Sequence, residues 1–289
     1  MENKIKQIVF EEFSTVINNI EGDLQNNNIK KNHNFLLNQL DEIIKTYMAF
    51  VSSFESKSGK AMERCAKRIA ILRYGKENVP TIVNPHNLKH PLDESSINDQ
   101  TIVTDINIDN GDLQGAITAF RKNREASGKG KKRKESQVTQ DTIKELLDSD
   151  FINQYKDGII HTKPVDLAYF DPDKKEWNIM ELKAGGALDG DNAKANVNKL
   201  LTEFVGMNSN NCNAYFATVY HKDGEGNTWK GAVKKHLNYP SMFLIGSDLW
   251  NKILPEGISY EDFTKIYKEA LEEIDLNSRI VNMIECCTN

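Results

Sequence analysis

The sequence has no apolar run as long as the roughly 18 residues that a membrane-spanning helix needs. It has only four cysteines, Cys65, Cys212, Cys286 and Cys287, and they lack the paired spacing of a zinc site. The adjacent pair near the tail cannot readily form a disulfide bond with each other, so reduced thiols are the better interpretation. The charged start of the chain does not resemble a signal peptide. We therefore expect a cytoplasmic protein without a membrane span.

The sequence also lacks the net positive charge that is typical of nucleic-acid-binding proteins, because its net charge is −5. This does not exclude DNA, since a cleft can be locally basic on an acidic protein. The clearest local excess of cations is GKGKKRK (128–134), which reads as a surface loop. The loop is either solvated or in contact with DNA phosphates, and phosphate contacts add affinity without sequence information. Its candidate DNA-binding residues are Lys129, Lys131, Lys132, Arg133 and Lys134.

Internal repeats and long low-complexity tracts are also missing, and 289 residues can form one large or two small domains. The first 75 residues are mostly helical by pattern. One apolar stripe comprises Phe10, Phe13, Val16 and Ile17; a second comprises Leu36, Leu37, Leu40, Ile43 and Ile44. A third helix is predicted over 59–73, with Gly75 past its end. His86 and His90 stand four apart, but neighbouring prolines place them in a loop, and a metal role is not favoured.

The most informative segment is PVDLAYFDPDKKEWNIMELKAGG (164–186), which predicts a β-hairpin. Its centre, Asp-Pro-Asp-Lys, is strong turn chemistry, and the runs 165–170 and 176–183 are rich in apolar and aromatic residues. If the hairpin folds symmetrically about residues 173 and 174, Asp166 lies opposite Glu181. Lys183 shares their face, because side chains alternate along a strand. Both faces are otherwise largely apolar, which indicates strands covered on both sides.

Two opposed carboxylates would have Cβ atoms about 5 Å apart, and their repulsion would be on the order of 3 kcal/mol. A shared cation or proton could offset that cost. The alternative is an exposed hairpin end, where Asp166 and Glu181 point into water and Lys183 merely pairs with them. Spacing alone does not decide between the two, because a slip of one residue exchanges the faces.

Further elements are predicted on both sides of the hairpin. A short strand fits 100–109, and helices fit 112–124 and 139–149. After the hairpin, a helix capped by Asp189 or Asp191 ends at Gly206, and its inner face comprises Val197, Leu200, Leu201, Phe204 and Val205. Strands at 213–220 and 242–246 and a helix at 260–274 follow. We expect an α/β protein in which residues 1–150 form a mostly helical N-terminal part and residues 151–289 the catalytic core.

The pattern Asp166…Glu181-Leu182-Lys183 resembles the PD-(D/E)xK signature of metal-dependent nucleases, although Val165 separates Pro164 from Asp166. The chain more specifically resembles type II restriction endonucleases of the TdeIII type. The resemblance rests on SFESKSGKAMERCAKRIA (53–70), VDLAYF (165–170) and MELKAGGALDGDNAKANVNKLLTEF (180–204). It implies a three-layer core with a mixed central sheet flanked by helices, and a helical N-terminal half packed on it.

The resemblance also implies chemistry. Magnesium, for which manganese substitutes, would be held by Asp166, Glu181 and the Leu182 carbonyl. The helix over 59–73 would contribute Glu63 to the metal and catalytic site, whereas spacing alone favours a solvated glutamate. Lys183 would orient water or stabilise the transition state. The expected products carry 5′-phosphates and 3′-hydroxyls.

Three functions are compared. The first is a bacterial type II restriction endonuclease: a homodimer that cuts double-stranded DNA at a short palindromic site and is paired with a DNA methyltransferase. By resemblance, that site would be similar to GGNCC. The second is a repair or junction nuclease of the same fold, which would select DNA structure. The third is a DNA-binding protein without catalysis, and the intact set of Asp166, Glu181 and Lys183 weighs against it.

Overall fold

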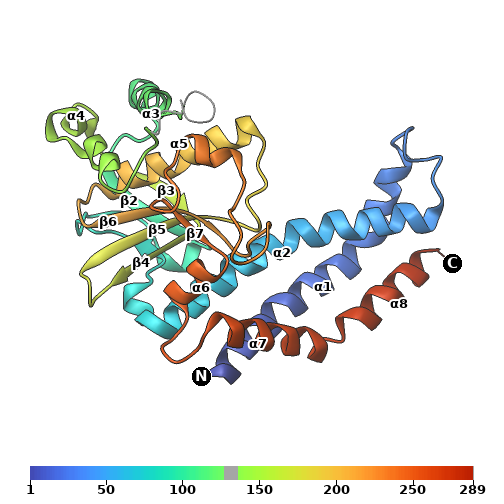
Figure 1. Cartoon of the computed structure of the whole chain (residues 1–289). Coiled ribbons are helices and arrows are strands. Elements are labelled where there is room, and N and C mark those ends of the chain that lie inside the picture. The colour runs from blue at the N-terminus through green and yellow to red at the C-terminus, as the bar shows by residue number, and fades with distance from the viewer. Residues whose placement is uncertain (127–135, 289) are drawn as a thin grey trace. The chain divides into compact units, whose positions relative to one another are not determined.

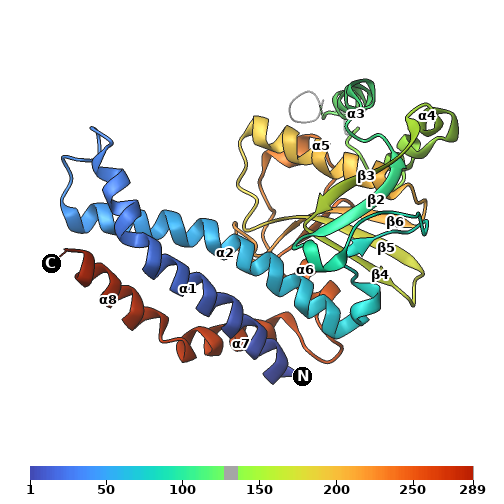
Figure 2. The same cartoon turned by 180° about the vertical axis from the view of Figure 1, so that it is seen from behind.

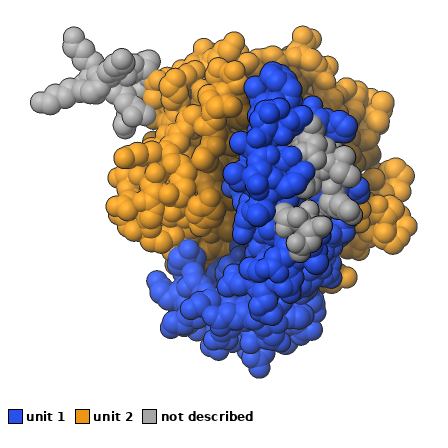
Figure 3. Space-filling view, turned by 90° about the vertical axis from the view of Figure 1, so that its right-hand side faces the viewer, with its two compact units in different colours: residues 1–69, 254–289 blue, residues 70–253 orange. Residues whose placement is uncertain are grey.

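The computed structural model describes residues 1–126 and 136–288. The chain divides into two compact units, residues 1–69 with 254–289 and residues 70–253 (Figure 3). This division differs from the boundary expected at residue 150. The strand that precedes residue 150 pairs with the strand that follows it, so both belong to the second unit.

The first unit is helical. It contains α1 (Glu2–Asn32), most of α2 (Glu42–Tyr74), α7 (Tyr260–Glu273) and α8 (Leu276–Thr288). In the apolar stripe of α1, Phe13, Val16 and Ile17 are buried and Phe10 is partly buried. Phe13 packs edge-on against Tyr267 of α7 with ring centroids 5.3 Å apart. Arg68 of α2 binds the carboxylates of Glu11 and Glu12 on α1, and Arg279 of α8 binds Glu21.

The second predicted stripe is wrong as a buried helical face. Residues 34–40 form turns, and α2 begins only at Glu42. The Asn34 side chain accepts a hydrogen bond from the Leu36 N–H, which favours a turn over a helix, and Asp41 accepts from the Ile43 N–H at the start of α2. Leu36 is 69% exposed. The third predicted helix is the C-terminal half of α2. The side chains expected on its inner side are all buried: Met62, Cys65, Ala66, Ile69 and Ala70.

The second unit contains two sheets (Figure 1). The first has the order β1-β2-β3, with β1 (Ile82–Val83) parallel to β2 (Gln100–Ile106) and β2 antiparallel to β3 (Lys156–Val165). The second has the order β4-β5-β6-β7. Its strands are β4 (Leu167–Asp171), β5 (Glu176–Lys183), β6 (Cys212–Thr218) and β7 (Phe243–Ile245), and only the β4–β5 pair is antiparallel.

Helices cover the four-stranded sheet. On one face, α5 (Gly190–Met207) buries its apolar residues against Ala168, Ile179 and Phe216, with α3 (Gly111–Asn123) packed beyond it (Figure 2). On the other face, the Tyr74 ring stacks on Tyr169 at 4.5 Å. The shorter helices are α4 (Ser149–Asn153) and α6 (Ser247–Ile253), and the 3₁₀ turns include Thr142–Leu147 and Ala232–Lys235.

The unit is therefore an α/β fold with mixed sheets flanked by helices, as predicted. The strand β3 was not predicted. The helix expected over 139–149 is instead a 3₁₀ turn followed by α4. Within the described residues, no helix is long and apolar enough to span a membrane.

Candidate active site

The predicted hairpin is present with the predicted register. Ala168 pairs with Ile179 and Phe170 with Trp177, so the strands fold about residues 173 and 174. The Asp171 carboxylate accepts hydrogen bonds from the N–H groups of Asp173 and Lys174, which fixes the turn. This register places position 166 opposite Glu181.

Asp166 is the single residue between β3 and β4, where the chain leaves the three-stranded sheet and enters the four-stranded one. The Leu182 N–H donates to Asp166 Oδ2 at 2.9 Å, which holds the carboxylate against β5. The Asp166 side chain is only 12% exposed. The Asp166 carboxylate, although it lies between two strands, is thus held in place by a backbone hydrogen bond from β5.

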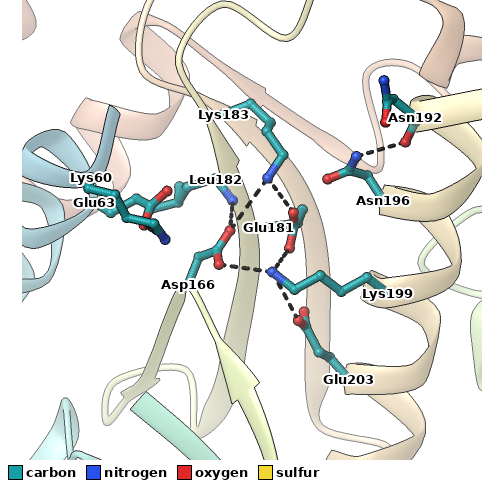
Figure 4. Close-up of polar contacts among 10 residues, drawn as sticks. All are labelled: Lys60, Glu63, Asp166, Glu181, Leu182, Lys183, Asn192, Asn196, Lys199 and Glu203. Carbon is teal, nitrogen blue, oxygen red and sulfur yellow. Dashed lines mark hydrogen bonds and ion pairs between the residues drawn. The ribbon is translucent and has the colours of Figure 1, made fainter. Parts of the chain in front are cut away.

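Glu181 and Lys183 lie on the face of β5 that α5 covers (Figure 4). The Glu181 side chain is 1% exposed. The Lys183 ammonium donates to Glu181 Oε1 in a close ion pair and lies 3.9 Å from Asp166 Oδ2. The structure therefore brings Asp166, Glu181 and Lys183 together in a largely buried cluster, so the exposed hairpin end considered from the sequence is wrong.

Two further charged residues, which the sequence interpretation missed, join this cluster from α5. Asp189 caps the helix by accepting from the N–H groups of Asp191 and Asn192. Nearly three turns further along α5, Lys199 donates to Asp166 Oδ1 at 2.9 Å and forms a close ion pair with Glu181 Oε2. One turn later, Glu203 Oε1 lies 3.7 Å from the Lys199 ammonium, and the Glu203 side chain is fully buried.

A signal for Glu203 was present in the sequence. Leu200, Leu201, Phe204 and Val205 belong to the predicted inner face of the helix, and position 203 lies beside that face, about 60° from Leu200 around the helix axis. The structure buries Glu203 fully, and a buried carboxylate needs a partner. Lys199 precedes it by one helical turn, which is the spacing of an intrahelical ion pair.

The pKa values of the two hairpin acids are shifted in opposite directions by the groups around them. Burial alone would raise the pKa of Asp166, but the nearby ammoniums of Lys199 and Lys183 and the Leu182 N–H lower it overall. Burial and the charge of Asp166 raise the pKa of Glu181, and the two lysines only partly offset this. The site thus holds one stable carboxylate beside one that gains a proton more readily.

The pKa values of Lys199 and Glu203 on α5 are shifted as well. Burial raises the pKa of Glu203 well above its usual range, and the charge of Glu181 adds to the effect. Burial would lower the pKa of Lys199, but Glu203, Glu181 and Asp166 together raise it, so the ammonium stays charged. Strongly perturbed groups that face one another in this way are typical of functional sites.

The donor atoms of the cluster fit a hard divalent cation, because Asp166 and Glu181 both offer carboxylate oxygens to one position. That position is taken by the Lys199 ammonium. Among the described residues, no group of three or more His, Cys, Asp or Glu side chains is arranged to hold a metal ion. The metal assignment therefore rests on the chemistry of the donors, and the predicted Leu182 carbonyl ligand stays a prediction.

Glu63 lies on α2 in the first compact unit, and the cluster lies in the second. Its side chain is 21% exposed and forms an ion pair with Lys60 Nζ at 2.7 Å. Its part in a metal site stays a prediction.

The basic segment with Lys129, Lys131, Lys132, Arg133 and Lys134 lies outside the described residues. The described residues beside it are anchored to the second unit. The Ala126 N–H donates to the Lys235 carbonyl at 2.8 Å, and the Val138 N–H donates to the His236 carbonyl at 2.9 Å.

The comparisons identify a family. The family described as "Type II restriction endonuclease, HinfI" matches residues 1–270 of the 289-residue chain. No curated protein and no solved structure matches the chain. The family match confirms the type II restriction endonuclease predicted from the sequence and does not distinguish the TdeIII type within that class. The chain belongs to the HinfI family of type II restriction endonucleases, and it is therefore a site-specific deoxyribonuclease.

Proposed function

We propose that this protein is a magnesium-dependent endonuclease of the PD-(D/E)xK kind, and that its active site is the cluster of Asp166, Glu181 and Lys183. The observation that carries the proposal is the convergence of the three side chains. Both acids contact the Lys183 ammonium, although Asp166 lies between two strands and the other two lie on β5. The family match supports DNA as the substrate.

Asp166 and Glu181 would hold the magnesium ion, with the Leu182 carbonyl and Glu63 as further ligands, and manganese would substitute. When bound, such an ion lowers the pKa of a coordinated water and neutralises charge on the phosphate oxygens. Residues of the chain orient the carboxylate oxygens of this site. The Leu182 N–H fixes one oxygen of Asp166 and leaves the other to face Glu181 across the Lys199 ammonium.

Lys183 would act as a donor. Its amino group donates to Glu181 and has further N–H groups for the attacking water or a phosphate oxygen. A donor at this position would stabilise the negative charge that develops on the phosphate in the transition state. Hydrolysis at this site would leave a 5′-phosphate and a 3′-hydroxyl.

Recognition of a short palindromic sequence would require a homodimer, since a two-fold axis places one active site on each strand. A cognate DNA methyltransferase would protect the host. A GGNCC-like sequence rests on the TdeIII resemblance alone. The basic segment over 128–134 would supply phosphate contacts, which position DNA but do not read it.

The test uses isosteric variants. Asp166→Asn keeps an oxygen that can accept from the Leu182 N–H, and Glu181→Gln keeps the volume of a buried side chain, so both should fold. We expect both variants, and Lys183→Met, to lose cleavage of phage DNA in magnesium while their circular dichroism stays unchanged. The control is Asp191→Asn, since the Asp191 side chain is 95% exposed on the start of α5.

The fragment ends from the wild-type digestion would be sequenced. Discrete fragments with fixed ends and one shared short sequence are the expected result. Near-normal cutting by Glu181→Gln would refute the site. Cleavage that follows branched or damaged DNA and not sequence would favour the repair or junction nuclease.

A further inference from the structure

The Lys199 ammonium lies between the two hairpin acids and is in close contact with both. It contacts Asp166 Oδ1 at 2.9 Å and Glu181 Oε2 in a close ion pair (Figure 4). The other two oxygens are held differently. Asp166 Oδ2 accepts from the Leu182 N–H, and Glu181 Oε1 accepts from Lys183. Lys199 therefore stands where a cation bridging the two acids would stand.

Both oxygens of Glu181 are paired with lysines, Oε1 with Lys183 and Oε2 with Lys199, so a divalent ion that binds Glu181 competes with one of these lysines. Lys199 is in direct contact with one oxygen of each acid. Lys183, in contrast, lies 3.9 Å from Asp166 Oδ2, which also accepts from the Leu182 N–H. Lys199 is thus the cation whose position a bridging ion would take.

Glu203 offers the displaced ammonium another partner. Its Oε1 is 3.7 Å from the Lys199 Nζ, one helical turn along the same helix. Both Glu203 oxygens are buried and have no hydrogen-bond partner within the described part of the chain. A small rotation of a flexible lysine side chain would exchange Asp166 and Glu181 for this carboxylate.

We propose that Lys199 is a displaceable internal counter-ion of the active site, positioned by Glu203. Without metal it holds Asp166 and Glu181 together, and when a divalent ion binds, its ammonium moves onto Glu203. The proposal rests on the proposed metal site at Asp166 and Glu181. It makes Lys199 and Glu203 positioning residues, which set the affinity of the site for metal.

The test is calcium binding to the full chain by isothermal titration calorimetry, with no DNA present. Lys199→Met removes the competitor, so calcium should bind at least about tenfold more tightly, since a charge-assisted contact need no longer be broken. Glu203→Gln removes the carboxylate that receives the ammonium, so calcium should bind severalfold more weakly. Opposite effects from two neighbouring residues are not expected from general loosening of α5.

The matched control is Lys194→Met, which makes the same change of charge on the same helix. Lys194 pairs with Asp191 at 2.9 Å and touches none of the cluster. It should leave calcium affinity within about twofold of the wild type, since exposed ion pairs contribute little. Weaker calcium binding by Lys199→Met, or a change no larger than the control, would overturn the proposal.

Lys199→Met leaves buried carboxylates without their cation and can therefore fail to fold. The double variant Lys199→Met/Glu203→Gln removes a buried charge together with its partner. Because Glu203 acts only through Lys199, the double variant should bind calcium as tightly as Lys199→Met. If it binds no more tightly than the wild type, the proposal fails.

Asp166→Asn separates this proposal from the proposed function. If it abolishes calcium binding while the Lys199 variants bind like the wild type, the metal site stands and the counter-ion role is wrong. If Asp166→Asn binds calcium normally, the metal site itself is wrong.

Discussion

The contribution of His236 to the stability of the second unit should fall as pH drops from 7 to 5. The His236 side chain is 2% exposed, and its Nδ1 lies 3.2 Å from Arg121 Nη1. Burial and the charge of Arg121 lower the pKa of His236 from 6.5 to about 4, and Lys235 and Lys194 add to this. Glu125, with a carboxylate oxygen 3.9 Å away, acts in the opposite direction.

The sign follows from proton binding. Between pH 6.5 and about 4 the unfolded chain binds a proton at position 236 and the folded chain does not. The contribution of His236 is therefore fully present above pH 6.5 and is lost as pH falls toward 4. At pH 5 the unfolded imidazole is nearly all charged and the folded one is about one-tenth charged, so the loss between pH 7 and 5 is about 2 kcal/mol.

The assay is urea unfolding followed by tryptophan fluorescence. All three tryptophans, Trp177, Trp229 and Trp250, lie in the second unit, so the signal reports on the unit that contains His236. Other groups also titrate in this range, and burial raises the pKa of Glu181, which acts in the opposite direction. The informative quantity is therefore the gap in unfolding free energy between the wild type and His236→Gln.

Between pH 7 and pH 5 we expect the unfolding free energy of the wild type to fall by about 2 kcal/mol relative to that of His236→Gln. Glutamine keeps an acceptor for Arg121 but does not titrate. A gap that stays constant within about 0.5 kcal/mol would show that His236 titrates near its usual pKa in the folded protein. The argument from burial and from the Arg121 charge would then be wrong.

Three further outcomes are expected. Glu63→Gln should lower magnesium-dependent cleavage strongly without changing the unfolding midpoint, and manganese-soaked crystals without an ion or its water shell near Glu63 would count against this. Serine replacements over 131–134 should weaken specific and non-specific DNA binding by similar factors and reduce the salt slope by about 0.9 for each lost phosphate contact, as read from binding titrations at several salt concentrations; an unchanged slope would assign the segment to solvent. Sedimentation with DNA that contains the cleaved site should show two chains per duplex, whereas one chain per duplex would contradict the homodimer.

The hairpin was predictable because two independent local signals agree on it. Turn residues fix the centre at 173 and 174, and apolar alternation fixes which side chains share a face. Asp166, Glu181 and Lys183 followed from that register. Their burial did not, because it depends on α5 covering the same face.

The strand β3 and the turn before α2 were missed for physical reasons that act beyond the local sequence. The first half of β3 is exposed, so Lys156–Val165 shows no apolar alternation, and its pairing with β2 gives it a strand structure. Residues 36–44 do carry apolar residues at helical spacing. The side-chain caps of Asn34 and Asp41 nevertheless break the helix before Glu42.

The charged cluster is better explained by chemistry than by stability. Glu181 and Glu203 lie in an interior where apolar side chains of similar volume would leave the fold as stable or more so. The charge of Lys199 offsets only part of the cost of burying the two carboxylates, since the pKa of each glutamate stays raised. The cluster brings three carboxyl groups, Asp166, Glu181 and Glu203, together with two lysines, Lys183 and Lys199. A divalent cation bound at the proposed site would supply further positive charge and lower the pKa of the acids around it, which stability alone would not require.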